Sequence, residues 1–209
     1  PPYSTVARDP QLSEMEYQFS NWYHFRWLSG DDVTQSLVHN LDRMRWVLHE
    51  ENPKWCFGLG GRSTSFGEVY GDVFDHHSVI YEFPNNVRIY AFCRTTTGCY
   101  DESSSLIWGT KGRADITACR IQGEKSWRWR PTGNDPHQLD PYQIEHDRLF
   151  AAIRSGNPIN NGDYLVDSTM TTVMGQISCY TGKEVDWEQI NASDFYLTNK
   201  PEDCRDGME

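Results

Sequence analysis

The amino-acid sequence predicts an α+β domain: an open, mainly antiparallel β-sheet with helices covering one face. Two changes of hydrophobic period support this prediction. Apolar residues recur every three to four positions as far as Pro53 and again from Asp140 onwards, which is typical of helices, whereas the stretch from residue 54 to about residue 130 alternates with a period of two. The strand-like runs follow one another as hairpins, and consecutive hairpins favour an antiparallel sheet over a doubly wound parallel one.

The first predicted helix follows an irregular lead-in, residues 1–12, which holds three prolines. Ser13 and Glu16 form the S-x-x-E pattern of a capping box, so we expect a helix to begin there. Ser29 and Gly30 supply a stop signal. A second helix, Gly30–Leu48, therefore follows after a very short turn.

This second helix separates into two chemically different faces at 3.6 residues per turn. An apolar stripe is formed by Val33, Leu37, Leu41, Met44 and Leu48. A row of hydrogen-bonding groups that ends in an indole is formed by Gln35, His39, Asp42 and Trp46. We interpret this row as the wall of a functional site, and the alternative is that His39 is a structural histidine.

The segment before the turn is unusually aromatic, reading NWYHFRW from Asn21 to Trp27. It brings Trp22, His24 and Arg26 close to the start of the second helix at Asp31. We interpret these four residues, together with Trp46 of the row, as substrate-binding. The alternative is an aromatic contact between helices.

The middle of the chain predicts two hairpins and an edge strand. The first hairpin turns at Pro84–Asn86, where residues that tolerate positive φ separate β-branched and aromatic runs. The expected strands are 54–61, 73–83, 87–95, 103–108, 113–121 and 126–130. The runs VIYEF and RIYAF place apolar residues on both faces of the sheet, so we expect the second face to lie in a homo-oligomer interface.

The last third of the sequence is helical again. Asp140-Pro141 predicts an N-cap followed by proline in the first turn, with a helix over 142–155. A further helix is expected over 164–180 and a returning strand over 185–190. The domain then spans 13–195, and residues 196–209 form a polar tail.

Composition narrows the possible partners. The chain has 30 acidic and 19 basic residues and a net charge of −11, which disfavours nucleic acid because phosphate binding needs a basic surface. No apolar run approaches the eighteen residues of a membrane span. Eight Trp, eleven Tyr and nine Phe supply rings that fill cores and stack on sugars and nicotinamides. The six cysteines form no CxxC pair, so we expect them to be reduced.

Two motif-like stretches are set aside. Gly58–Gly61 lacks the G-x-G-x-x-G spacing that opens a helix, so it is not a dinucleotide-binding loop. Asp75-His76-His77 suggests a metal site, but neighbouring residues on a strand point to opposite faces. We therefore expect no metal there.

The order and spacing of five motifs resemble the C-terminal, substrate-binding and oligomerisation domain of the Gfo/Idh/MocA family of NAD(P)-dependent oxidoreductases. The motifs are SGDDVTQSLVHNLDRMRWVL, YGDVFDHHSVIYEF, GTKG between two strands, PYQIEHDRLFAAIRSGNPINN and STMTTVMGQISCYTGKEVDW. The resemblance implies that NAD or NADP binds mainly to an N-terminal Rossmann domain, which this chain lacks. We expect both chain ends to be cuts in a longer polypeptide, which leaves cytoplasmic and periplasmic locations open.

In this resemblance His39 matches the family's active-site histidine, and Gln35 stands where several members have an acid. A neutral imidazole can accept or relay the hydroxyl proton that hydride transfer from an alcohol leaves behind. Gln35 can only orient His39 or a hydroxyl, and we expect Asp42 on the next turn to supply the charge instead, so His39, Gln35 and Asp42 are the candidate catalytic residues.

Three functions follow from these observations. The first is the substrate half of an NAD(P)-dependent oxidoreductase acting on a sugar or polyol-like substrate. The second is an NAD-dependent glycosidase or lyase of the same family, and the third is a non-catalytic carbohydrate-binding or scaffolding module.

Overall fold

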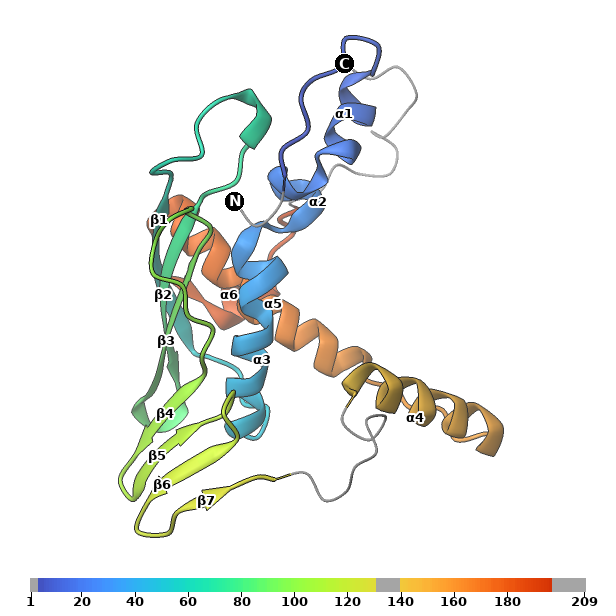
Figure 1. Cartoon of the computed structure of the whole chain (residues 1–209). Coiled ribbons are helices and arrows are strands. Elements are labelled where there is room, and N and C mark those ends of the chain that lie inside the picture. Colours follow the sequence, from blue (N-terminus) through green and yellow to red (C-terminus); the bar gives the residue numbers. More distant parts are fainter. Residues whose placement is uncertain (1–3, 131–139, 197–209) are drawn as a thin grey trace. The chain divides into compact units, whose positions relative to one another are not determined.

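A computed structural model describes residues 4–130 and 140–196 of the chain (Figure 1). They divide into two compact units, a larger one of residues 4–101 and 166–196 and a smaller one of residues 102–130 and 140–165. Each unit contains one antiparallel sheet together with helices. The predicted α+β class is therefore confirmed. The tail from residue 197 lies outside the described residues.

The larger unit is built on a four-stranded antiparallel sheet in the order β3-β2-β1-β8 (Figure 1). Its strands are β1 (Trp55–Gly61), β2 (His76–Phe83), β3 (Val87–Arg94) and β8 (Val185–Asp186). The predicted turn between β2 and β3 is confirmed as a short 3-10 segment, Pro84–Asn86, in which Asn85 and Asn86 have φ values of 62° and 60°. Asparagine tolerates this left-handed conformation better than most residues, which explains why the hairpin closes here.

Helices cover one face of this sheet. They are the π-helix η2 (Val33–Leu37), α3 (Val38–Val47) and the part of α5 (Gly162–Thr181) from Val166 onwards. The buried core joins the predicted apolar stripe to the inward residues of the strands: Val33, Leu37, Leu41, Cys56, Val79, Tyr81, Phe83, Ala91, Met174, Cys179 and Val185. Helix α5 lies so close to β2 that a side chain at Gly175 would collide with the Tyr81 hydroxyl.

The predicted first helix is wrong in its extent, although its start is confirmed. Ser13 accepts a hydrogen bond from the Glu16 amide and Glu16 bonds back to Ser13, as a capping box requires. The segment then breaks into α1 (Glu14–Ser20), η1 (Trp22–His24) and α2 (Arg26–Ser29). The break is at Asn21, whose side chain accepts from the Val6 amide at 3.0 Å and donates to the Val69 carbonyl at 2.8 Å.

The smaller unit contains a second antiparallel sheet in the order β4-β5-β6-β7. Its elements are β4 (Leu106–Gly109), β5 (Gly112–Asp115), β6 (Arg120–Gly123), β7 (Trp127–Arg128) and helix α4 (Pro141–Ser155). The strand predicted over 113–121 is wrong, because a turn at residues 116–119 divides it. Asp115 accepts from the Ala118 amide at 2.9 Å and Cys119 has a φ of 49°, which together form this turn.

The predicted strand over 185–190 is also mostly wrong. After β8 the chain forms α6 (Trp187–Asn191). The Asp186 carboxylate accepts from the amides of Glu188 and Gln189 at 2.9 and 3.1 Å, which makes Asp186 an N-cap.

The sheet of the larger unit leaves its second face uncovered by the described helices. Four large apolar side chains of this face are exposed: Phe57, Leu59, Tyr90 and Phe92. Within the described parts of the chain, every cysteine is free, and each helix is too short or too polar to span a bilayer.

Candidate functional site

The predicted row of polar residues begins in a stretch of π-helix. Gln35 lies in η2, whereas His39, Asp42 and Trp46 lie in α3. π-helical insertions occur frequently at functional sites because they shift one residue out of the regular helical ladder. Regular 3.6-residue periodicity contains no signal for such an insertion, so the sequence interpretation missed it.

His39 is exposed, and it forms no hydrogen bond or ion pair with any residue that the structure describes. Its imidazole is therefore accessible to an external group. Trp46 is also exposed, at 71%. Gln35 is half-buried and accepts a hydrogen bond from the Ser36 hydroxyl.

Asp42 ties the row to the neighbouring helix. Its Oδ1 accepts a hydrogen bond from Ser168 Oγ of α5 at 2.7 Å. The half-buried carboxylate thus fixes one side of α3 against α5, one turn away from His39. His39 itself makes no described bond to either Gln35 or Asp42.

Asp31 is the centre of a buried polar cluster at the start of the helix. The residue is 2% exposed and has a φ of 66°. Its Oδ2 accepts from the Tyr180 hydroxyl, from His77 Nε2 at 3.1 Å and from the Phe74 amide at 3.3 Å. These donors come from α5, β2 and the preceding loop, so one carboxylate connects three segments to the beginning of η2.

The electrostatics of this cluster favour the charged carboxylate. Burial would raise the pKa of Asp31, but hydrogen bonding and electrostatic attraction by His77, with the Tyr180 hydrogen bond, outweigh burial and hold that pKa below its usual value. The opposite applies to the Tyr180 phenol, whose pKa is raised well above its usual range by burial and by the Asp31 charge. Tyr180 therefore stays protonated and donates its hydrogen bond permanently.

The aromatic segment is attached to this cluster. Arg26 lies over the Tyr180 ring, with its guanidinium carbon 4.2 Å from the ring centroid, and its Nε donates to Asp72 at 2.8 Å. Tyr23 donates to Asp32 Oδ1 at 3.0 Å. The sequence interpretation correctly expected this segment to lie close to the start of the second helix.

The five predicted substrate-binding residues differ in accessibility. Trp22 and Trp46 are exposed and Arg26 is half-buried, whereas Asp31 and His24 are both buried. A ligand could not reach Asp31 without displacing its protein partners. His24 Nε2 has no hydrogen-bond partner among the described residues, and burial lowers the pKa of this imidazole.

His76 and His77 contact different carboxylates, as expected for neighbours on a strand. His77 Nε2 binds Asp31, and His76 Nδ1 lies 2.8 Å from Asp75 Oδ1. Asp75 also accepts from the amides of residues 63, 64 and 65 at 2.8 to 3.0 Å. The described residues contain no group of three or more His, Cys, Asp or Glu side chains arranged to hold a metal ion.

Sequence reasoning missed Phe74, His77 and Tyr180 as neighbours of the helix start. Phe74 and Tyr180 stack with their ring centroids 3.8 Å apart, and Cys93 Sγ lies 3.6 Å from His77 Nδ1. The available signal was the adjacent pair Asp31-Asp32 directly after Gly30, since two acids at a buried helix start need partners.

Of the comparisons with known proteins, the one with solved structures identifies the fold. No protein-family model matches the sequence, and no curated protein sequence matches it. Many solved structures match the coordinates. The aldose-aldose oxidoreductase from Caulobacter crescentus, in complex with glycerol, matches with a TM-score of 0.61 and 18% identity over 87% of this chain and 52% of that chain.

Two further structures show the same pattern. Myo-inositol 2-dehydrogenase from Lactobacillus plantarum has a TM-score of 0.59 and 15% identity over 81% of this chain and 52% of that chain. GenD2 from gentamicin A biosynthesis, solved with NAD, has a TM-score of 0.56 and 17% identity over 79% of this chain and 51% of that chain.

The chain therefore has the fold of the C-terminal half of Gfo/Idh/MocA-type oxidoreductases, and it spans about half the length of these solved relatives. Identities of this size establish the fold alone.

Proposed function

We propose that this chain is the substrate-binding half of an NAD(P)-dependent oxidoreductase that acts on a sugar or polyol-like substrate. In this proposal a Rossmann domain, which lies outside this chain, holds the cofactor and faces the row Gln35, His39, Asp42 and Trp46. The single observation that supports it best is the accessible imidazole of His39, on a helix that is otherwise firmly packed.

His39 would act on the proton of the reacting alcohol. Hydride transfer from the C–H bond to the nicotinamide leaves the hydroxyl proton to be removed as the carbonyl forms, and a neutral imidazole within hydrogen-bond reach can accept it. No described residue holds the His39 ring in another role. The ring therefore needs no rearrangement of protein bonds before it meets a substrate.

Gln35 and Trp46 would position the substrate in this proposal. An amide donates and accepts hydrogen bonds but cannot take a proton, so Gln35 suits a substrate hydroxyl. The exposed indole of Trp46 suits the apolar face of a sugar ring. Trp22 and Arg26 are the substrate-facing candidates of the aromatic segment, and Asp31 and His24 would support it from inside the domain.

One observation favours a second candidate within the same chemistry. Gln35 supplies no carboxylate beside His39, which leaves room for an NAD-dependent glycosidase or lyase that oxidises its substrate only transiently. In that case bound NAD is regenerated in each cycle. Net NAD(P)H formation during turnover separates the two candidates, because only the oxidoreductase produces it.

We also propose that two copies of this chain associate through the open face of the β3-β2-β1 sheet. A second copy fits because Phe57, Leu59, Tyr90 and Phe92 are exposed on one side of three paired strands, and a two-fold interface matches such a patch with itself.

Phe92→Asp tests this interface, with Phe66→Asp as the matched control in a loop outside the sheet. Sedimentation velocity should show an oligomer for the wild type and the control, and a monomer for Phe92→Asp. A wild-type chain that remains monomeric at micromolar concentration would contradict the interface.

The polypeptide sequence in front of Pro1 gives the first test of the enzymatic proposal. A strand followed by G-x-G-x-x-G and a helix is expected there. Purified protein that includes this region should bind NAD or NADP and form its reduced cofactor with polyols. A polypeptide without a nucleotide-binding domain, which binds sugars but turns nothing over, would support the non-catalytic module instead.

A further inference from the structure

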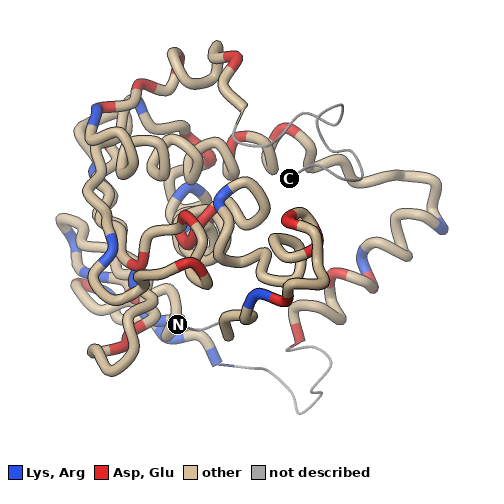
Figure 2. The backbone as a smooth tube through the Cα atoms, turned by 90° about the horizontal axis from the view of Figure 1, so that it is seen from above, with Lys and Arg blue, Asp and Glu red and all other residues tan. Residues whose placement is uncertain are grey.

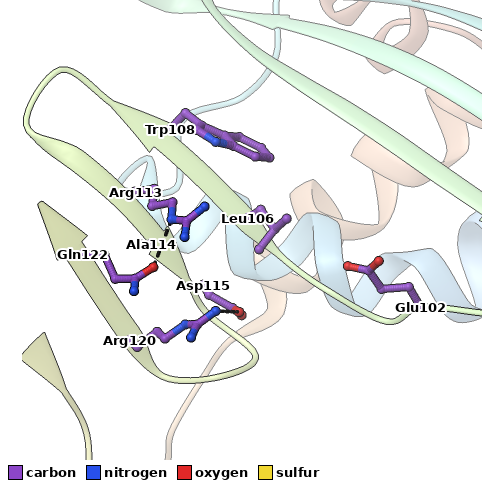
Figure 3. A pocket seen from close by; sticks show the side chains of 8 residues that line it. All are labelled: Glu102, Leu106, Trp108, Arg113, Ala114, Asp115, Arg120 and Gln122. Atoms are coloured by element: carbon purple, nitrogen blue, oxygen red, sulfur yellow. Dashed lines mark hydrogen bonds and ion pairs between the residues drawn. The ribbon is translucent and has the colours of Figure 1, made fainter.

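The smaller unit contains a pocket of about 210 Å³ on one face of the β4-β7 sheet (Figure 3). None of its residues belongs to the row around His39. The lining residues are Glu102, Leu106, Trp108, Arg113, Ala114, Asp115, Arg120 and Gln122.

Strand register explains how these side chains meet. Trp108, Arg113 and Gln122 are directly paired across β4, β5 and β6, so they form one row across the sheet. Leu106, Asp115 and Arg120 form the next row on the same face, two residues along each strand. Figure 3 shows Glu102, on the segment before β4, directing its carboxylate toward these rows.

The polar groups are held in defined positions. Arg113 Nε donates to Gln122 Oε1 at 3.0 Å, and Arg120 Nη2 lies 3.6 Å from Asp115 Oδ2. The Arg113 guanidinium is thereby anchored through its Nε edge, whereas Arg120 forms an ion pair with Asp115. The planar fork of arginine carries five N–H donors, so an anchored guanidinium retains donors for a ligand.

Trp108 supplies the apolar surface. Its side chain is 73% exposed, although a large indole normally gains by burial. It pairs across the strands with Arg113, so the indole and the anchored guanidinium lie side by side at the rim of the pocket (Figure 3).

The charges of the lining determine the kind of ligand. Two arginines face two carboxylates, Glu102 and Asp115, so the pocket has no formal net charge. The surrounding residues 104–130 carry six basic and two acidic residues in a chain of net charge −11. Figure 2 marks the acidic and basic residues along the backbone. A neutral lining that alternates donors and acceptors suits vicinal hydroxyl groups, which donate and accept together. A phosphate or a polyanion would meet the two carboxylates together with the two arginines, so this lining offers it no net attraction.

From this arrangement we infer that the pocket binds a neutral sugar ring, which stacks on Trp108 while its hydroxyls bond to Arg113, Gln122 and the two carboxylates. The pocket volume of about 210 Å³ lies below the usual range of about 300 to 1,000 Å³ for ligand pockets, so the pocket accommodates no more than about one monosaccharide ring. The inference is independent of the oxidoreductase proposal, because no residue of the row around His39 takes part.

Titration calorimetry of the full chain with maltotriose tests the inference, with sodium glucuronate, inorganic phosphate and a thymidine oligonucleotide as comparison ligands. Maltotriose should bind, and each of the other three should bind at least about tenfold more weakly, because one unfavourable charge interaction of 1.4 kcal/mol gives this factor. Stronger binding of glucuronate, phosphate or the oligonucleotide would overturn the assignment of a neutral sugar.

Variants locate the site. Trp108→Ala and Arg113→Gln should each weaken maltotriose binding by at least about tenfold, because a stacking surface or a charge-assisted hydrogen bond is lost. Arg113→Lys should weaken it too, because lysine lacks the fork. Lys125→Gln removes an exposed charge outside the pocket and should leave binding within about twofold.

Circular dichroism must show that each variant is folded. If Arg113→Gln does not fold, Arg113→Lys replaces it as the test of Arg113. Unchanged affinity in the folded Trp108 and Arg113 variants would overturn the site. His39→Asn should leave maltotriose binding unchanged, whether or not His39 is catalytic. Loss of binding in that variant would show that the sugar occupies the other site.

Discussion

Replacement of Asp31 by Asn tests the buried cluster at the start of the helical segment η2–α3. The change keeps the shape of the side chain and removes its charge. Asparagine tolerates positive φ, so the φ of 66° at this position introduces no new backbone strain. Any loss of stability therefore reports on the hydrogen bonds of the carboxylate.

The magnitude follows from the donors that Asp31 satisfies. Three of them converge on Oδ2, from Tyr180, His77 and Phe74, and the Asp32 amide donates to Oδ1 at 2.6 Å. An asparagine oxygen can replace only one carboxylate oxygen, and its NH2 group then faces a donor. The neutral hydrogen bonds of asparagine are weaker, and one donor is left unsatisfied. The lower desolvation cost of an amide offsets part of this. The net loss in free energy of unfolding should be about 2 to 4 kcal/mol.

Urea unfolding followed by tryptophan fluorescence and circular dichroism measures this loss. Asp72→Asn is the matched control, because Asp72 is exposed and accepts from the Arg26 amide and Nε at 2.7 and 2.8 Å. An exposed ion pair contributes at most about 1 kcal/mol. Asp31→Asn with a midpoint and slope equal to those of the control would refute the reasoning about the cluster.

Two further predictions concern the same region. Gly71→Ala should destabilise the chain by more than about 2 kcal/mol in the same unfolding assay. Gly71 has a φ of 52°, and a methyl group there would collide with the His24 carbonyl. Wild-type stability of this variant would contradict the described turn. The free energy of unfolding should fall as the pH drops below about 4. Burial raises the pKa of Asp75, but hydrogen bonds from the Thr64 amide and other donors outweigh it and leave that pKa depressed, as for Asp31. A carboxyl group whose pKa is depressed in the folded state stabilises the fold above its unfolded pKa, and this stabilisation is lost on acidification. An unfolding midpoint that rises below pH 4 would contradict the hydrogen-bonded networks described around Asp31 and Asp75.

The local elements could be predicted because their signals are local. The capping box at Ser13, the turn at Pro84–Asn86 and the N-cap at Asp140 each depend on residues within four positions of one another. The same reasoning failed at Asp115 and Asp186. There a single aspartate ends a strand by bonding to amides two or three residues ahead, and alternation of apolar residues does not reveal this.

The candidate site was only partly predictable for a different reason. Helical periodicity places His39 and Trp46 away from the core, and the structure shows both exposed. Asp31, His77 and Tyr180 meet only after the chain has folded, across separations of up to 149 residues, and no periodicity reports such contacts. The sequence therefore predicts which face of the helix is accessible more readily than what anchors the helix.

The account depends most on His39 as the acceptor of a substrate proton. The decisive measurement is turnover of the proposed longer polypeptide, with its nucleotide-binding domain, comparing His39→Asn with His49→Asn, an exposed histidine beyond the end of α3. We predict that His39→Asn lowers kcat by about 100-fold or more while cofactor affinity stays within about twofold, and that His49→Asn behaves as wild type. Equal kcat values for the two variants would contradict the account.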